Sequence, residues 1–434
     1  MVKQMTWIRF GVFASVLGTV GGAWAQSLTL EEAITLARRN NGFILAAYAD
    51  LSSARSQVRQ ASGSFLPTVL PTARYDSSRT ETELSSGTSI SRFNEASAEI
   101  DARWRLLDSG QRMLILRSSK FSENAQKAST AQTIRQILFS VHERFFNSLR
   151  NQELVRVSDV SVERANEIYK LTEAQIELKI APRKDILQAR ADVLNAKVDQ
   201  LGAKNQSAAA DALLRSIIGW DVTKPFPNLE KPAAPAAMSE LPDLQTAIKN
   251  GLAQREDLRS TRFTIEAQRL FVERARIEAG LTWAVDASYS KTFADRDSDS
   301  RAFSIIFSYP LFDGNQSREE ARQAEFALDR IKVQYRQAEA DAAAEIESAF
   351  RTVMQDRERL DAAKSALEAA NENFKAATES QQLGAEGTNV ITVLTAKISL
   401  ITAESNYVNA LYDVQVSEMR FRLVTGQPIP GELQ

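Results

Sequence analysis

The sequence predicts a mainly α-helical chain with a smaller β part, in which one layout occurs twice. Three observations lead to this prediction. Two segments of about 70 residues contain neither glycine nor proline, a region of each half alternates apolar and polar residues, and several motifs recur in the same order. A chain of 434 residues is long enough to hold both copies.

The N-terminus is typical of a secretory signal peptide. Lys3 and Arg9 give a basic start, residues 10–20 are apolar, and residues 23–25 read Ala-Trp-Ala, a small-x-small cleavage site. We therefore expect residues 1–25 to be removed and the mature chain to begin at Gln26. No cysteine follows the cleavage site, so no lipoprotein anchor is expected.

The composition excludes several classes of function. The chain has no cysteine, which excludes disulfides, thiolate metal sites and cysteine nucleophiles, and its net charge of −2 argues against a nucleic-acid partner. The one histidine, His142, stands alone in a helical segment, and no HExxH, P-loop, GxSxG or GxGxxG motif occurs. We expect no enzyme activity, no cofactor and no metal site.

Four pairs of motifs divide the chain into two repeats. They are residues 28–34 with 241–248, 106–110 with 311–315, 185–190 with 392–397, and 215–219 with 422–426. A segment with five prolines lies between the copies and predicts an extended connector. The expected layout is a first repeat over 26–219, a connector over 220–242, a second repeat over 243–426 and a tail over 427–434.

Each repeat contains one very long helical segment. The runs free of glycine and proline lie between Gly110 and Pro182 and between Gly314 and Gly384. At 1.5 Å per residue, each predicts a helix of roughly 100 Å, which must pack as a coiled coil to bury its apolar stripe. Seams of the a/d type occur, of which residues 134–145, 360–377 and 394–412 hold the clearest.

A short break follows each long segment, and another helical segment follows the break. We therefore predict two helical hairpins, with tips near residues 180–184 and 384–389. The charged residues that flank these helices elsewhere are typical of a solvated coiled-coil surface.

Each repeat also contains a pair of alternating segments, near residues 69–106 and 281–312. Apolar and aromatic residues alternate there with polar ones, as in strands that face lipid on one side and water on the other. Residues 78–91 and 294–300 are polar, and we expect them to form loops outside the cell. No later run of about 20 apolar residues predicts a spanning helix, so membrane entry would be through β-structure.

Four strands cannot close a membrane barrel, because the smallest barrels have about eight. An open edge in lipid would leave backbone groups without partners, at several kcal/mol each. The barrel must therefore be shared, with eight strands from two chains or twelve from three. The strand number alone does not choose between these.

The ordered, duplicated motifs resemble the TolC family of outer-membrane efflux and secretion channels over about residues 27–426. The resemblance is carried by residues 28–33 and 65–69, the Leu-Phe-Asp-Gly turn at 311–314 with its copy at 106–108, and residues 185–187 and 393–394. It implies a homotrimer with a shared 12-stranded barrel in the outer membrane and long periplasmic hairpins. It also implies a periplasmic adaptor (a membrane fusion protein) and an inner-membrane pump of the ABC or RND type as partners.

The same resemblance implies functional residues at the hairpin tips. The candidate entrance residues are Arg183, Lys184, Asp185, Thr392 and Thr395, and the candidate adaptor contacts are Ala181, Pro182, Gly384, Ala385, Glu386 and Gly387. Where some relatives have an aspartate pair after the second tip, this chain has Thr392 and Thr395. Asp185 matches an aspartate after the first tip and is a candidate to pair across a closed entrance.

Two alternatives remain beside a passive export duct. A periplasmic adaptor would have one hairpin between two halves of a β domain, and a structural coiled-coil envelope protein would not need aromatic strand rows. The cargo is open between small molecules, such as drugs or metal ions, and protein in type I secretion. The absence of a lipid anchor slightly favours a shared or protein-secretion role.

Overall fold

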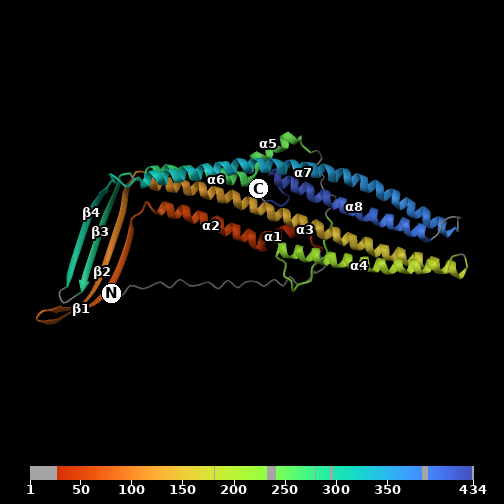
Figure 1. Cartoon of the computed structure of the whole chain (residues 1–434), viewed down its shortest axis with the longest axis horizontal. Helices are drawn as coiled ribbons and strands as arrows, with labels where there is room; N and C mark the ends of the chain where they lie inside the picture. Colours follow the sequence, from red (N-terminus) through yellow and green to blue (C-terminus); the bar gives the residue numbers. More distant parts are fainter. Residues whose placement is uncertain are drawn as a thin grey trace, which may run out of the picture.

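The computed structural model describes residues 27–179, 181–231, 241–278, 280–293, 297–383 and 390–432. The molecule is long and narrow, with a β-sheet at one end and two hairpin tips at the other (Figure 1). The predicted signal peptide, much of the connector, the second tip from 384 to 389 and the last two residues lie outside the described ranges.

Each half of the chain opens with two helices, continues with a strand pair and ends with a long hairpin. The first half contains α1 (Leu30–Asn40), α2 (Gly42–Gly63), β1 (Thr68–Leu84), β2 (Gly87–Asp108), α3 (Gln111–Glu177) and α4 (Arg183–Ile218). The second contains α5 (Leu244–Gln254), α6 (Glu256–Arg276), β3 (Thr282–Phe293), β4 (Ser298–Ser308), α7 (Gln316–Gln382) and α8 (Val390–Val424).

The long helices α3 and α7 each have 67 residues and run from the sheet toward the tips (Figure 1). This confirms the predicted long helices, which no glycine or proline interrupts. Helices α4 and α8 return along them. Among the described residues, no helix combines the length and the apolar character that crossing a membrane requires.

The main hydrophobic core lies where α1, α3, α4 and α8 meet. Leu138, Val141 and Phe145, which belong to one predicted seam of α3, are fully buried there, against Leu214 of α4 and Tyr412 of α8. The connector follows α4 and contacts the segment just before α1, because Leu229 pairs with Leu28 in an isolated parallel bridge. This core fixes the two hairpins to each other at mid-length.

The strands form one antiparallel sheet in the order β1-β2-β3-β4. The four predicted strands are therefore present, but the predicted loop over residues 78–91 is wrong. Strand β1 continues to Leu84, β2 begins at Gly87, and only residues 85–86 form the turn. Likewise β4 begins at Ser298, inside the second predicted loop.

The reason for this error is physical. Antiparallel pairing uses backbone hydrogen bonds, so a strand outside an apolar environment needs no alternation of apolar residues. Residues 77–83 are serine, threonine, arginine and glutamate, and they pair with 88–94 in continuous register. Beyond Ala96, strand β2 has no pairing to β3, so the β1–β2 hairpin extends past the other two strands.

Candidate functional site

The sheet has one apolar face and one polar face. Neighbours in register place Val69, Ala102, Ala287 and Phe303 in one row, and Thr68, Arg103, Asp286 and Ser304 in the next row on the opposite face. On the polar face, Arg103 Nε donates to Asp286 Oδ1 at 2.7 Å. On the apolar face, the rings of Trp283 and Phe307 lie 4.5 Å apart. Such a sheet suits a wall between lipid and water.

The first tip is described from Ala181 onward, and its candidate residues differ in exposure. Arg183, Lys184 and Pro182 are exposed, Ala181 is half-buried, and Asp185 is buried at 7%. Asp185 lies in the first turn of α4, where the positive end of the helix dipole stabilises a carboxylate. Its pairing across an entrance stays a prediction, and in this conformation its own chain covers it.

Only two of the candidate residues at the second tip lie within the described part of the chain. Gly384, Ala385, Glu386 and Gly387 lie outside the described residues. Thr392 and Thr395 are exposed in the first two turns of α8, and Thr395 Oγ1 donates to the carbonyl oxygen of Ile391 at 2.8 Å. Of the described tip residues, Asp185 is buried and Ala181 half-buried, and Pro182, Arg183, Lys184, Thr392 and Thr395 are exposed positions.

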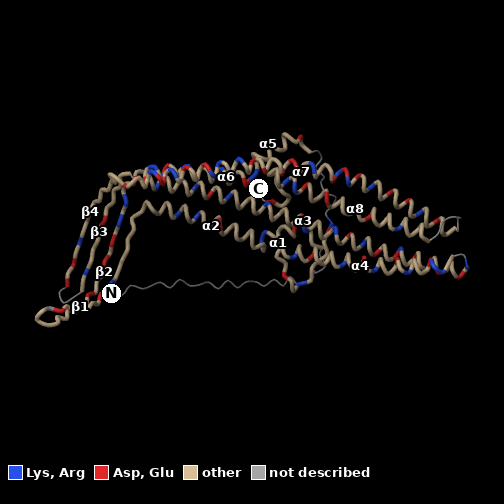
Figure 2. Tube along the Cα trace, in the orientation of Figure 1, with Lys and Arg blue, Asp and Glu red and all other residues tan. Residues whose placement is uncertain are grey.

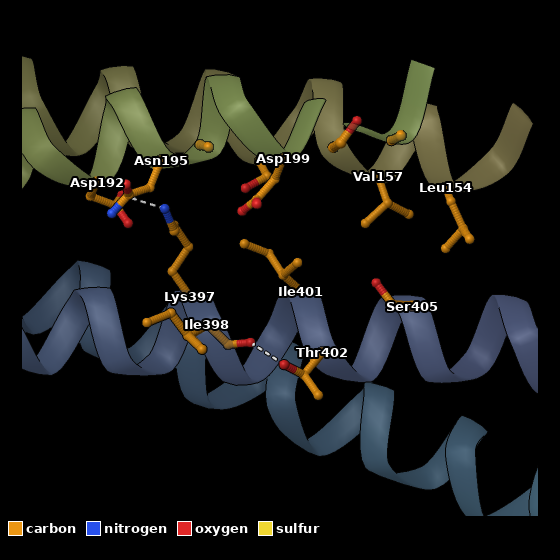
Figure 3. Close-up of a pocket in the computed structure, with 14 residues that line it drawn as sticks. Leu154, Val157, Asp192, Asn195, Asp199, Lys397, Ile398, Ile401, Thr402 and Ser405 are labelled. Atoms are coloured by element: carbon orange, nitrogen blue, oxygen red, sulfur yellow. Dashed lines mark hydrogen bonds and ion pairs between the residues drawn. The ribbon is translucent and has the colours of Figure 1, made fainter. Parts of the chain in front are cut away.

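The feature that the sequence analysis missed lies farther from the tips, between the two hairpins. A cavity of about 430 Å³ is lined by α3, α4 and α8, and Lys397 of α8 reaches across it to Asp192 of α4 (Figure 3). The Lys397 side chain is only 2% exposed. A lysine is almost never buried without a partner, and here the carboxylate of Asp192 is the partner of the buried Lys397 ammonium group.

A second ion pair joins the hairpins nearby. Arg164 of α3 donates two hydrogen bonds to Glu404 of α8, from Nη1 to Oε2 at 3.0 Å and from Nη2 to Oε1 at 2.9 Å. The Arg164 guanidinium also lies 5.7 Å from the centre of the Phe374 ring of α7. Elsewhere along the helices, acidic and basic residues are interspersed in the chain (Figure 2). The sequence showed both partners as ordinary helix charges, because their pairing depends on how two hairpins meet.

Helix α4 carries an apolar stripe that the described part of its own chain leaves largely exposed. Leu187, Leu194, Val198 and Leu201 follow seam spacing and are 55–67% exposed. Counting from the first residue of each helix, the positions in α8 that match Leu187 and Leu201 are Leu394 and Val408, which are buried. The same position is thus buried in the second hairpin and open in the first.

The described residues contain no group of three or more histidine, aspartate or glutamate side chains placed to hold a metal ion. His142 is buried, and its Nδ1–H donates to the carbonyl oxygen of Leu138 at 2.8 Å. Burial lowers its pKa, the Leu138 bond opposes that shift, and nearby Arg422 adds to it. A neutral histidine inside a helical core is structural.

A two-faced sheet joined to two long hairpins defines the class of outer-membrane channel protomers. The family model for outer membrane efflux proteins matches residues 33–220 and 247–427. The chain belongs to the outer membrane efflux protein family. It is an efflux channel of the outer membrane with a long periplasmic helical part, and it is not an enzyme.

Solved structures show the same fold. CusC is 18% identical with a TM-score of 0.79, and 92% of each chain is covered. The Campylobacter jejuni outer membrane channel CmeC is 17% identical with a TM-score of 0.76, over 98% of this chain and 94% of that one. The open-state Neisseria gonorrhoeae outer membrane channel MtrE is 17% identical with a TM-score of 0.75, over 93% and 90%. No curated protein sequence matches the chain.

Proposed function

We propose that three copies of this chain form one passive duct, with a shared 12-stranded barrel in the outer membrane and a ring of hairpins in the periplasm. The observation that carries this proposal is the sheet with its two free edges. Strands β1 and β4 are its outer strands, and its apolar face is exposed. In lipid both edges need strand partners, which further copies supply.

The apolar stripe on α4 supports the same ring. In the second hairpin the matching stripe is covered by α3 of the same chain, so the stripe on α4 is suited to α7 of a neighbouring copy. Closed rings need such head-to-tail contacts, in which two different surfaces of each subunit meet. Large exposed apolar stripes of this kind mark protein interfaces.

At the far end, the tips would meet a periplasmic adaptor, and the adaptor would connect the duct to an inner-membrane pump of the ABC or RND type. The exposed candidates at the first tip are Pro182, Arg183 and Lys184. Residues 384–387 would contribute the second contact. The pump supplies the energy and selects the cargo, which in this proposal is either small molecules or a secreted protein.

The experiment is site-specific photo-crosslinking in living cells. A photoreactive residue replaces Arg183 at the first tip, and a matched variant carries it at Arg322, an exposed position near the sheet end of α7. We expect mass spectrometry to identify an adaptor captured by the tip variant and not by the Arg322 variant.

Capture of the same adaptor at both positions, or of none at the tip, would contradict the tip assignment. The trimer has a separate readout: the native mass of the detergent-purified protein. A mass of one or two chains would contradict the ring.

A further inference from the structure

The apolar face of the sheet has aromatic side chains toward both ends. Trp283 and Phe307 lie opposite each other in the row nearest the helices, and Tyr75 and Phe293 share a row far from them, because both pair with Ala96. On β3, Trp283 and Phe293 are ten residues apart. At about 3.4 Å per residue and a tilt of about 40°, this separation gives about 25 Å of height, which is the usual height of the apolar band between two aromatic girdles.

Charge is distributed unequally along this apolar face. In the paired rows of the described strands, the two rows nearest the helices contain only apolar residues, namely Leu107, Trp283, Phe307, Trp104, Val285 and Ile305. The far half is different. One row nearer the helices than Phe293, Lys291 pairs with Asp299, and in the following row Tyr289 pairs with Arg301. Two cations of one chain therefore lie on the lipid-facing side, close to the outer aromatic row.

Both cations lie against aromatic rings. The Arg301 guanidinium carbon is 5.7 Å from the centre of the Tyr289 ring, and Lys291 Nζ is 5.1 Å from the centre of the Phe293 ring. Asp299 Oδ2 is 3.8 Å from Arg301 Nη2, and these two side chains are 59% and 79% exposed. A long, exposed contact of this kind contributes little. One carboxylate thus stands beside two cations, and the group keeps a net positive charge.

The position of the cations indicates what neutralises them. A cation on the lipid side of a barrel is unfavourable at mid-membrane, and this cost falls near the headgroups, which long basic side chains can reach. Phospholipid phosphates lie at both surfaces of a membrane, so a site for them would be equally suited to either half of the face. In the paired rows the cations lie in the half away from the periplasmic helices. That half faces the outer leaflet, where the lipid of Gram-negative cells is a glycolipid with phosphates on its sugars.

We propose that Lys291 and Arg301 bind a sugar-linked phosphate of an outer-leaflet glycolipid, and that Tyr289 and Phe293 hold the two cations at headgroup level. Both side chains can donate charge-assisted hydrogen bonds to phosphate oxygens, and the planar guanidinium can donate two at once. The site lies within β3 and β4 of one chain. It therefore requires a membrane barrel, but it is independent of the number of copies in that barrel.

Binding of fluorescently labelled diphosphoryl lipid A to the detergent-purified protein tests the site. Lys291→Gln with Arg301→Gln should weaken binding about tenfold or more, because two charged donors are lost. The matched control, Arg74→Gln with Arg105→Gln, removes two exposed cations from the polar face of the same sheet and should leave the affinity unchanged. An equal loss of affinity in both double variants would overturn the proposal.

Unlabelled competitors identify the ligand. Diphosphoryl lipid A should displace the probe, whereas dephosphorylated lipid A, phosphatidylglycerol and inorganic phosphate at the same concentration should not. Displacement by dephosphorylated lipid A would show binding through the acyl chains. Displacement by phosphatidylglycerol would show a general anionic-lipid surface, and displacement by inorganic phosphate a site for free phosphate. Each of these three results would contradict a glycolipid site.

Two further variants separate charge from folding. Asp299→Asn removes the carboxylate that competes for both cations and should strengthen binding about two- to fivefold. Lys291→Arg with Arg301→Lys keeps both charges and should retain binding. Weaker binding by Asp299→Asn would show that a divalent cation on Asp299 holds the lipid, and loss of binding by the charge-conserving variant would show that charge is not the cause. Either outcome would overturn direct phosphate binding by Lys291 and Arg301.

Discussion

At the residue scale, the repeated turn before each long helix has a clear physical role. Asp108 ends β2 and accepts hydrogen bonds from the backbone N–H and the Nε of Arg112, at 3.0 and 2.7 Å. In the second copy, Asp313 accepts from the backbone N–H of Ser317 at 3.0 Å. Each aspartate therefore satisfies a free N–H at the start of a 67-residue helix. The motif match identified these positions, but not their partners.

Asp108→Ala should destabilise the chain strongly. Asp108 and Arg112 are both buried, and Arg112 also donates to the carbonyl oxygen of Ser64 at 3.2 Å. Removal of one partner from a buried ion pair costs about 3–5 kcal/mol. Thermal unfolding followed by circular dichroism should show a large decrease in the unfolding temperature for Asp108→Ala. The decrease should be smaller for Asp313→Ala, because Asp313 is exposed. Equal drops would contradict this account.

His142 should make the stability of the helical core depend on pH. Burial lowers its pKa, so the folded chain keeps it neutral while the unfolded chain protonates it near pH 6.5. The unfolded state then binds more protons, so stability falls as the pH drops below about 6.5. We expect the unfolding temperature to decrease from pH 7 to pH 5.5, and His142→Gln to flatten this change. The chain has no other histidine. If His142→Gln shows the same pH dependence of the unfolding temperature as the unchanged protein, protonation of His142 is not its cause.

The sequence identified tip residues from a resemblance, but it could not identify Lys397 as buried. On a helical wheel Lys397 is one more cation, and its environment depends on a second hairpin whose position no local pattern encodes. The available signal was the repeat itself, which aligned Arg190 with Lys397. Lys397 is buried in the second repeat, whereas Arg190 at the matching position of the first repeat is exposed. Comparison of the two repeats therefore shows that the two positions have different environments.

At the element scale, the two long helices were predictable because the absence of glycine and proline and the spacing of apolar residues are local properties. The strands were predictable only where lipid requires apolar side chains. The polar ends of β1 and β2 are held by backbone pairing, which carries little signal in the side chains. This explains why the predicted loop was too long.

The stripe on α4 should be required for assembly but not for folding. Leu201→Lys places a charge at the C-terminal end of the stripe, where the single chain leaves the side chain 67% exposed. We expect the variant to keep its helical content and to lose the trimeric mass, because a charge must then be buried without a partner. The matched control is Gln206→Lys, an exposed residue outside the stripe. Loss of assembly in both variants would show that the stripe has no special role.

At the scale of the whole molecule, the sheet and the tips lie at opposite ends (Figure 1), so the turn of the β1–β2 hairpin and the tips should lie on opposite sides of the outer membrane. An epitope tag inserted between Ser85 and Ser86, in the turn of the β1–β2 hairpin, should bind antibody on intact cells. A tag placed between Ala181 and Pro182 should bind only after the outer membrane is permeabilised. Labelling of the tip in intact cells would contradict this orientation.

The part of the β1–β2 hairpin that extends past β3 also has a consequence for colloidal behaviour. Beyond Ala96 its two strands pair only with each other, so both outer edges present free backbone groups. Such edges invite pairing with identical hairpins on neighbouring molecules. Arg79 stands opposite Arg92 in this segment, with Glu81 and Glu83 beyond it. Charged side chains along both edges oppose the dry stacking of strands that fibrils require, so densely packed channels can display these hairpins without cross-linking into aggregates.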